Sequence, residues 1–261
     1  MKHSDLLKIL IVLATVLLIV DGRHRGRKYN KKRRQRIKNP DNHFDLLIFT
    51  QHWPQTVCFT WKEEYVSHTC LLPTNEEWTI HGIWPTQMGK IGPSYCNNAS
   101  HFDSSALSPI EDDLKTKWLD VENGTAHYSF WKHEWDKHGT CAMVLPSINN
   151  ELKYFKKGIE LLDAYDMKYV LAKANILPNN QYKVQEILDG VEKILGKRGQ
   201  VECIINPKTK ERYLFEVRIC FDKSFNLINC DGIADFPTNC SKKKNIIYPS
   251  SVPDLIKVVQ I

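Results

Sequence analysis

Eight cysteines constrain this chain more than any other feature of its sequence. They are scattered from Cys58 to Cys240, and none forms a CxxC pair, which argues against a zinc ribbon or a thioredoxin-like redox site. An even, scattered set predicts four disulfides formed in an oxidising compartment. Eight cysteines allow roughly a hundred pairings, so the spacing alone leaves the connectivity open.

The N-terminus agrees with such a compartment. Lys2 and Lys8 precede an apolar run at 9–20. This run is too short for a transmembrane helix, which needs about 20 apolar residues, and it has the length of a signal-peptide core. We therefore expect residues 1–22 to be a signal peptide and expect no stable membrane insertion, with a retained membrane anchor as the alternative.

Three glycosylation sequons, at Asn98, Asn123 and Asn239, fit the same secretory route. The sequon at Asn239 has Cys240 as its middle residue, and a disulfide at that position would hinder access to the asparagine. We expect the protein to be secreted or to reside in the lysosomal lumen.

The positive net charge comes from one short basic arm. Residues 23–38 carry ten Lys and Arg and no acid, residues 1–22 are neutral overall, and subtracting ten from the net charge of +6 leaves −4 for residues 39–261. A mildly acidic folded part argues against a large cationic surface for nucleic acid. We expect 23–43 to be a disordered or processed arm; the alternative is an arm that holds RNA or anionic lipid by its charge.

Apolar periodicity predicts both strands and helices after residue 43. Strands are expected at 44–50, 78–84 (ended by Pro85), 202–205, 213–221 and 225–230, and amphipathic helices at 149–164 and 185–195. These elements show no regular strand–helix alternation and no internal repeat. We therefore predict a single α+β domain over 44–261, with a mainly antiparallel sheet and helices packed on it.

One further helix is expected to begin at Ser108. Ser108 would cap it, Pro109 would be its first residue, and Glu111 would complete a capping box. Leu114 and Trp118, four residues apart, would then share its apolar face.

The segment 130–141 (FWKHEWDKHGTC) concentrates the polar chemistry of the chain. We expect a short helix that stops at Gly139. Residues four apart lie on one side of a helix, so Glu134 would stack with His138 and His133 with Lys137. Trp131 and Trp135 would form an apolar stripe beside them and shift the pKa values of the histidines. The alternative is a solvated, charged helix face.

A zinc site is not expected at this segment. His133-Glu134 begins like HExxH, but the second histidine of that motif would fall at 137, where the chain has lysine. His133 and His138 are five residues apart and should diverge around a regular helix.

A second segment, 78–85 (WTIHGIWP), places His81 among alternating apolar residues. Gly82 allows a close approach, and Trp84-Pro85 should end the strand. The alternative for a lone histidine on a strand is a satisfied core residue.

Both segments resemble the signatures of the ribonuclease T2 family, the acid ribonucleases of the secretory and lysosomal route. Those signatures read approximately aromatic-T-x-H-G-L-W-P and x-W-x-H-E-W-x-K-H-G-T-C, and Ile83 replaces the usual leucine here. Gln51-His52-Trp53-Pro54, the later cysteines and Tyr248-Pro249 are similar too. The resemblance extends over about residues 44–250.

The resemblance implies the family's α+β fold and specific disulfides and roles. The implied disulfides are Cys58–Cys70, Cys96–Cys141, Cys203–Cys240 and Cys220–Cys230. The implied roles are His138 as general base on the ribose 2′-hydroxyl, His81 as general acid to the departing 5′-oxygen, His133 as phosphate ligand, and Glu134 and Lys137 as stabilisers of the transition state. The products would be a 2′,3′-cyclic phosphate and then a 3′-phosphate, with an acidic pH optimum.

The expected partner is single-stranded RNA. DNA lacks the 2′-hydroxyl that serves as nucleophile, and an internal nucleophile needs neither metal nor cofactor. Trp53 and Trp84 are candidates for stacking on bases, with core packing as the alternative for Trp53. We expect a monomer. The alternative functions are a secreted signalling or cytotoxic factor that acts without cleaving RNA, and an RNA-binding protein that uses the basic arm.

Overall fold

The computed structural model describes residues 43–255, so the predicted signal peptide and nearly all of the basic arm lie outside the described residues. The described chain folds around one mixed sheet of seven strands, in the order β2-β1-β5-β7-β3, with β4 and β6 also pairing with β5. The strands are β1 (Leu46–His52), β2 (Thr79–Thr86), β3 (Asn180–Tyr182), β4 (Gln200–Ile205), β5 (Arg212–Phe221), β6 (Leu227–Ile228) and β7 (Ile246–Tyr248). The pairs are antiparallel except β5 with β7, which confirms the predicted α+β class.

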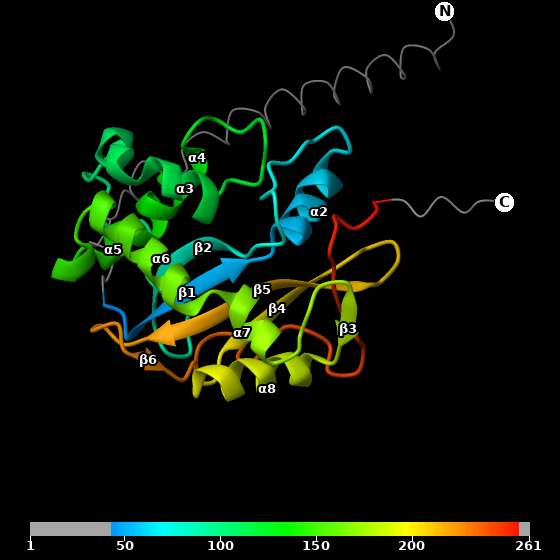
Figure 1. The fold of residues 1–261 in the computed structure, drawn as a ribbon. Coiled ribbons are helices and arrows are strands. Elements are labelled where there is room, and N and C mark those ends of the chain that lie inside the picture. Colours follow the sequence, from blue (N-terminus) through cyan, green and yellow to red (C-terminus); the bar gives the residue numbers. More distant parts are fainter. Residues whose placement is uncertain (1–42, 256–261) are drawn as a thin grey trace, which may run out of the picture. The chain divides into compact units, whose positions relative to one another are not determined.

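Helices cover this sheet (Figure 1). They are α2 (Pro54–Glu64), the 3-10 helix η1 (Ser104–Ile110), α3 (Glu111–Lys117), α4 (Ser129–Glu134), the π-helical turn η2 (Trp135–Gly139), α5 (Thr140–Ala142), the 3-10 turn η3 (Pro146–Ile148), α6 (Glu151–Tyr165), α7 (Met167–Lys173) and α8 (Val184–Leu195). The predicted amphipathic helices at 149–164 and 185–195 are confirmed as α6 and α8. α6 contacts β1 and β2, whereas α8 contacts β4 and α7.

Strand β1 is the centre of the core. All seven of its residues are buried, because its two faces meet two different apolar clusters. Leu47 and Phe49 belong to the main cluster beneath α6. Leu46 and Ile48 lie in a second cluster with the Cys220–Cys230 disulfide. A strand covered on both faces reads as a continuous apolar run rather than an alternating one, as the sequence of 44–50 does.

The boundaries predicted at Ser108 and Pro85 are wrong. The helix expected to begin at Ser108 begins earlier, as η1, where the side chain of Asp103 accepts a hydrogen bond from Ser105 N. Ser108 lies inside that turn and donates to Ser105 O. Pro85 does not end β2 but pairs with Leu47. Proline is tolerated there because β2 is the edge strand, whose outer N–H needs no partner in the sheet.

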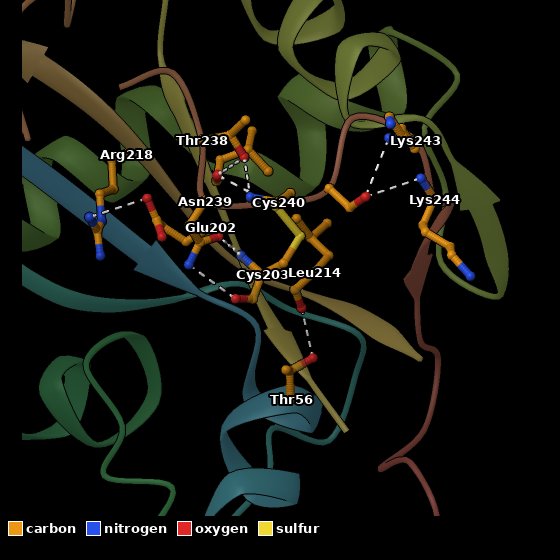
Figure 2. The surroundings of a disulfide bond; sticks show 12 residues. Thr56, Glu202, Cys203, Leu214, Arg218, Thr238, Asn239, Cys240, Lys243 and Lys244 are labelled. Carbon is orange, nitrogen blue, oxygen red and sulfur yellow. Dashed lines mark hydrogen bonds and ion pairs between the residues drawn. A yellow bond between two sulfur atoms is a disulfide. The ribbon is translucent and has the colours of Figure 1, made fainter. Parts of the chain in front are cut away.

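The four implied disulfides are confirmed as Cys58–Cys70, Cys96–Cys141, Cys203–Cys240 and Cys220–Cys230. Figure 2 shows the third of them, which joins β4 to the segment before β7. Beside it, Asn239 Oδ1 accepts a hydrogen bond of 2.8 Å from Cys203 N, and Asn239 Nδ2 donates one of 3.2 Å to Cys203 O (Figure 2). The side-chain amide of this sequon asparagine therefore pairs with the backbone of β4 as a neighbouring strand would.

No helix within residues 43–255 is both long and apolar enough to cross a membrane.

Candidate active site

His81 is the extra residue of a β-bulge. Thr50 of β1 lies opposite Gly82, but the next residue, Gln51, lies opposite Ile80, so His81 has no partner across the ladder. A bulge redirects the side chain of its extra residue and is common beside active sites. His81 keeps a side chain that is 29% exposed.

The ring of His81 is held from both sides by buried carboxylates. Its Nδ1 lies 2.5 Å from Oε1 of Glu216 on β5, and its Nε2 lies 3.8 Å from Oε1 of Glu134 at the end of α4. The rings of His52 and Phe130 lie 5.3 Å and 5.9 Å away. Nε2 is thus the freer nitrogen, the one that a ligand could reach.

The helix that carries His133 to His138 does not stop at Gly139, contrary to the prediction. α4 continues through the π-helical turn Trp135–Gly139 into α5. A Cβ on Gly139 would lie 2.2 Å from Cε3 of Trp135, so this glycine makes room for a buried indole instead of ending a helix.

The π-turn also changes which side chains are neighbours. A π-turn widens one turn of the helix, so His133 and His138 are rotated apart by less than their spacing of five would give on a regular helix. The charge of His133 contributes to lowering the pKa of His138. π-turns inside α-helices occur frequently at functional sites.

Trp84 lies between the two histidines that the sequence singled out. Its ring centroid is 4.9 Å from that of His81 and 5.3 Å from that of His138. Its Nε1 donates a hydrogen bond of 3.0 Å to Oε2 of Glu134, and the guanidinium of Arg218 lies 5.2 Å from its ring centroid. The two predicted signature segments therefore meet at this indole.

The pKa values of the two histidines move in opposite directions. Burial alone lowers the pKa of His81, but the charge and hydrogen bond of Glu216, together with the charge of Glu134, raise it above its ordinary value. Burial and the positive charge of Lys137 lower the pKa of His138 well below its ordinary value. Just below pH 6.5 this arrangement favours a protonated His81 beside a neutral His138.

The other titratable groups of the site respond to the same surroundings. Burial raises the pKa of Glu134 to about 7, although the charge of His81 and the hydrogen bond from Trp84 oppose this. Partial desolvation of its ring and the charge of Lys137 lower the pKa of His133. The positive charge of Lys137 therefore contributes to lowering the pKa values of three groups of the site, His133, Glu134 and His138.

A cleft of about 380 Å³ opens at His81 and includes His52, Phe130 and His133 in its lining. Phe130 also lines a larger, more apolar groove of about 800 Å³, to which Asn123 contributes. Within the part of the chain that the structure describes, no three His, Cys, Asp or Glu side chains are grouped so that they could hold a metal ion.

Comparisons with known proteins show the family of this chain. The model of the ribonuclease T2 family matches residues 44–230. Ribonuclease Oy of Magallana gigas is 37% identical over 211 residues, which cover 79% of this chain and 96% of that protein. The chain belongs to the ribonuclease T2 family.

Solved structures of this family share the fold. The crystal structure of human RNase T2 has a TM-score of 0.66 at 31% identity and covers 79% of this chain and 99% of its own. A mutant of RNase MC1 in complex with 5′-UMP has a TM-score of 0.67 at 31% identity, with 79% of this chain and 99% of its own covered.

The structure separates the two tryptophans that were candidates for base binding. Trp84 is half-buried and borders the histidines. Trp53 is fully buried, donates from Nε1 to Pro249 O and packs against Trp78 and Tyr248. Trp53 therefore has no face on which a base could stack, and core packing, the alternative, is correct. Trp131 and Trp135 form the buried stripe that was predicted.

Two residues of the site were missed in the sequence. Glu216 and Arg218 contact His81 and Trp84, yet they lie in the apolar run 213–221, far from either signature segment. A signal was present: two charged side chains, two residues apart, share one face of a strand whose other residues are strand formers. A buried charge on a strand needs a partner, so this pair was itself a candidate for a functional position.

Proposed function

We propose that this chain, a T2-type endoribonuclease, cleaves single-stranded RNA by metal-independent transphosphorylation, with His138 as general base and His81 as general acid. The observation that carries the proposal is the opposed shift of the two pKa values across Trp84. A neutral imidazole can accept a proton while a protonated one donates, so the pair suits a reaction that needs both in one step.

In the first step His138 accepts the proton of the ribose 2′-hydroxyl as the 2′-oxygen bonds to phosphorus. The bond from phosphorus to the 5′-oxygen breaks, and His81 transfers its Nε2 proton to that oxygen. The products are a 2′,3′-cyclic phosphate and a 5′-hydroxyl. In the second step the histidines exchange roles and water opens the ring to a 3′-phosphate.

The remaining site residues would act on the phosphate. We assign His133 and Lys137 to phosphate binding, because a fixed positive charge stabilises a phosphoryl group as charge develops on it. Glu134, whose pKa is raised to about 7, retains a proton at acidic pH and would stabilise the transition state beside them. Trp84 is the remaining candidate for contact with a base, and the 5′-UMP complex of RNase MC1 shows that a protein of this fold binds a nucleotide.

The secretory route is part of the proposal. Four disulfides require an oxidising compartment to form, and Asn98 and Asn123 are exposed sequon residues. Asn239 is a poor acceptor in the folded protein because both atoms of its amide bond the backbone of Cys203. We propose a secreted or lysosomal protein with glycans at Asn98 and Asn123.

The direct test is cleavage of a short labelled RNA, beside the DNA of the same sequence, from acidic to neutral pH in EDTA. We expect RNA alone to be cut, with cyclic or 3′-phosphate ends and no loss in the chelator. Purified protein with four disulfides that cuts neither strand would contradict the proposal and favour a signalling role. Activity that EDTA abolishes would contradict the metal-free mechanism.

A further inference from the structure

We propose that Glu216 is the positioning residue of His81: its carboxylate, fixed by Arg218, holds the Nδ1 proton of His81 and thereby presents Nε2 as the proton donor of the site. The inference rests on the proposed function for the use of that proton, since Nε2 donates only if His81 is the acid. The contact itself is a property of the fold and can be tested without any reaction.

Both oxygens of Glu216 are occupied. Oε1 lies 2.5 Å from Nδ1 of His81, and Oε2 accepts from Nε and Nη2 of Arg218 at 3.0 Å and 2.6 Å. The side chain of Glu216 is 1% exposed. An ionised carboxylate only accepts hydrogen bonds, so the proton in the short contact belongs to Nδ1. Neutral His81 is then the Nδ1–H tautomer, and Nε2 is the nitrogen that gains and loses a proton.

Two β-bulges bring the pair together. The first leaves His81 without a partner between β1 and β2. The second lies between β4 and β5, where Glu202 faces Glu216 but Cys203 faces Leu214, so that Phe215 is the extra residue. Each bulge turns the strand locally, and each lies at or next to one partner of the contact. The register of three strands, β2, β1 and β5, therefore determines that Glu216 reaches His81.

Arg218 extends the contact to the rest of the site. Its Nη1 lies 3.3 Å from Oε1 of Gln200 and 3.6 Å from Oε1 of Glu202, the second of which is drawn in Figure 2. The guanidinium faces Trp84 at 5.2 Å, and Trp84 donates to Glu134. A continuous set of contacts thus leads from His81 through Glu216 and Arg218 to Trp84 and back through Glu134. This closed arrangement fixes the ring of His81 on two sides.

Several charged or titratable groups face His81, and Glu216 raises its pKa most. They are Glu216 and Arg218 from β5, His52 from β1, Glu134, His133 and His138 from α4 and η2, and Glu122 from the loop before α4. The charge and the hydrogen bond of Glu216 both favour the protonated imidazole, and Glu134 adds to them. Removing the charge of Glu216 should therefore lower the pKa of His81, although Glu134 remains.

The first test uses the unaltered protein and no substrate. Nitrogen-15 spectra of the imidazole rings are recorded across pH, and the signals of His81 are assigned with His81→Gln. We expect Nδ1 to stay protonated through the titration while Nε2 loses its proton. A neutral His81 that carries its proton on Nε2 would overturn the proposal. This outcome would be independent of RNA cleavage, so it separates failure of the positioning role from failure of the proposed function.

The second test compares Glu216→Gln with Glu211→Gln, the same change in the turn before β5, where Glu211 bonds Thr209 and Tyr213. Glu216→Gln should lower the pKa of His81 by about one unit or more. The alkaline limb of the pH profile of kcat/KM should move to lower pH by the same amount, with the loss in kcat rather than KM. Glu211→Gln should leave the limb in place.

Glu216→Asp restores the charge at a shorter reach and should recover part of the shift. An alkaline limb that stays fixed in folded Glu216→Gln would refute the role of Glu216. If that variant fails to fold, the tautomer of His81 in the unaltered protein decides.

Discussion

Trp84 donates a hydrogen bond of 3.0 Å from Nε1 to Oε2 of Glu134, and Gly82 leaves the space that this bond needs. A Cβ on Gly82 would lie 2.1 Å from Glu134 Oε2 and 2.3 Å from Trp84 Nε1. Such separations do not occur in folded proteins, so a side chain at 82 would have to displace one of the two partners. The glycine after His81 is thus explained by the hydrogen bond between Trp84 and Glu134, which needs the space that a side chain at 82 would fill.

Gly82→Ala should therefore damage both stability and activity. We expect the free energy of unfolding to fall by about 1–3 kcal/mol, as for other overpacked sites. We expect kcat/KM to fall by about 100-fold, because small misplacements of catalytic groups are costly. Urea unfolding and initial rates on a short RNA measure the two effects. Gly190→Ala, a buried glycine on α8 that would press on Ile176 and Ala174, should alter stability alone; equal kinetic losses in both variants would contradict the explanation.

Replacing either histidine of the proposed acid–base pair should remove most of the activity. His81→Phe and His138→Phe should each reduce kcat on the order of 10³-fold, since each loses general acid or base catalysis. The double variant should be little worse than either single one, because groups that act in one step are not additive. His101→Phe, at an exposed position, is the matched control. Near-normal turnover by a clean preparation of either variant would remove that histidine from the mechanism.

The pH profile should identify each histidine by its limb. The base must be neutral, and the pKa of His138 lies well below 6.5, so kcat/KM should rise at acidic pH as His138 loses its proton. The acid must be protonated, and the pKa of His81 is raised, so the rate should fall above pH 6.5 as His81 loses its proton. Rates on a labelled RNA across pH test this, and a single alkaline optimum would contradict the paired-histidine scheme.

The local parts of the site could be predicted from the sequence, but their exact helical geometry could not. His133, Glu134, Lys137 and His138 come from a single short segment, so one helix necessarily keeps them close. The π-turn was missed because Gly139 has two possible explanations, and only the position of Trp135 in the folded core distinguishes between them. A glycine after a helical segment indicates a stop only when no side chain needs its space.

The non-local parts could not be predicted for a different reason. Glu216 meets His81 only because β1 pairs with both β2 and β5 in one register, and a single sequence contains no record of that pairing. Trp53 looked equally suited to core packing and to stacking on a base, because an indole ring can do either. Its burial depends on Tyr248, which comes from the far end of the chain. Helix α2 was missed because its sequence shows little amphipathic pattern.

His52 should make the protein less stable in acid. Its ring is buried, and burial together with the charge of His81 lowers its pKa to about 3. The unfolded chain takes up this proton below about pH 6.5 and the folded chain only near pH 3, so the free energy of unfolding falls between these values by about 1.4 kcal/mol per pH unit. His52→Gln should remove this dependence. Urea unfolding at pH 6.5 and 4.5 should show the variant losing about 2–3 kcal/mol less than the original protein; an identical loss would contradict the assignment.

The Cys96–Cys141 disulfide should matter to both folding and catalysis, because it fastens the π-turn. Cys141 lies in α5, which directly follows η2. On the Cys96 side of the disulfide, Tyr95 N donates to Lys137 O at 3.0 Å, and Cys96 N donates to Thr140 Oγ1 at 3.2 Å. Breaking the disulfide frees the segment that carries Lys137 and His138.

Replacing both cysteines of this pair by alanine should lower the free energy of unfolding by roughly 4 kcal/mol, since the disulfide closes 45 residues, and should reduce kcat as well. The matched control removes Cys220–Cys230, which closes only 10 residues, and should cost roughly 3 kcal/mol with a smaller loss of kcat. Chemical unfolding and single-turnover rates separate the two effects. If the two variants lose kcat equally, the disulfide at Cys141 contributes only to stability, and the π-turn keeps its shape through the packing of Trp135 against Gly139.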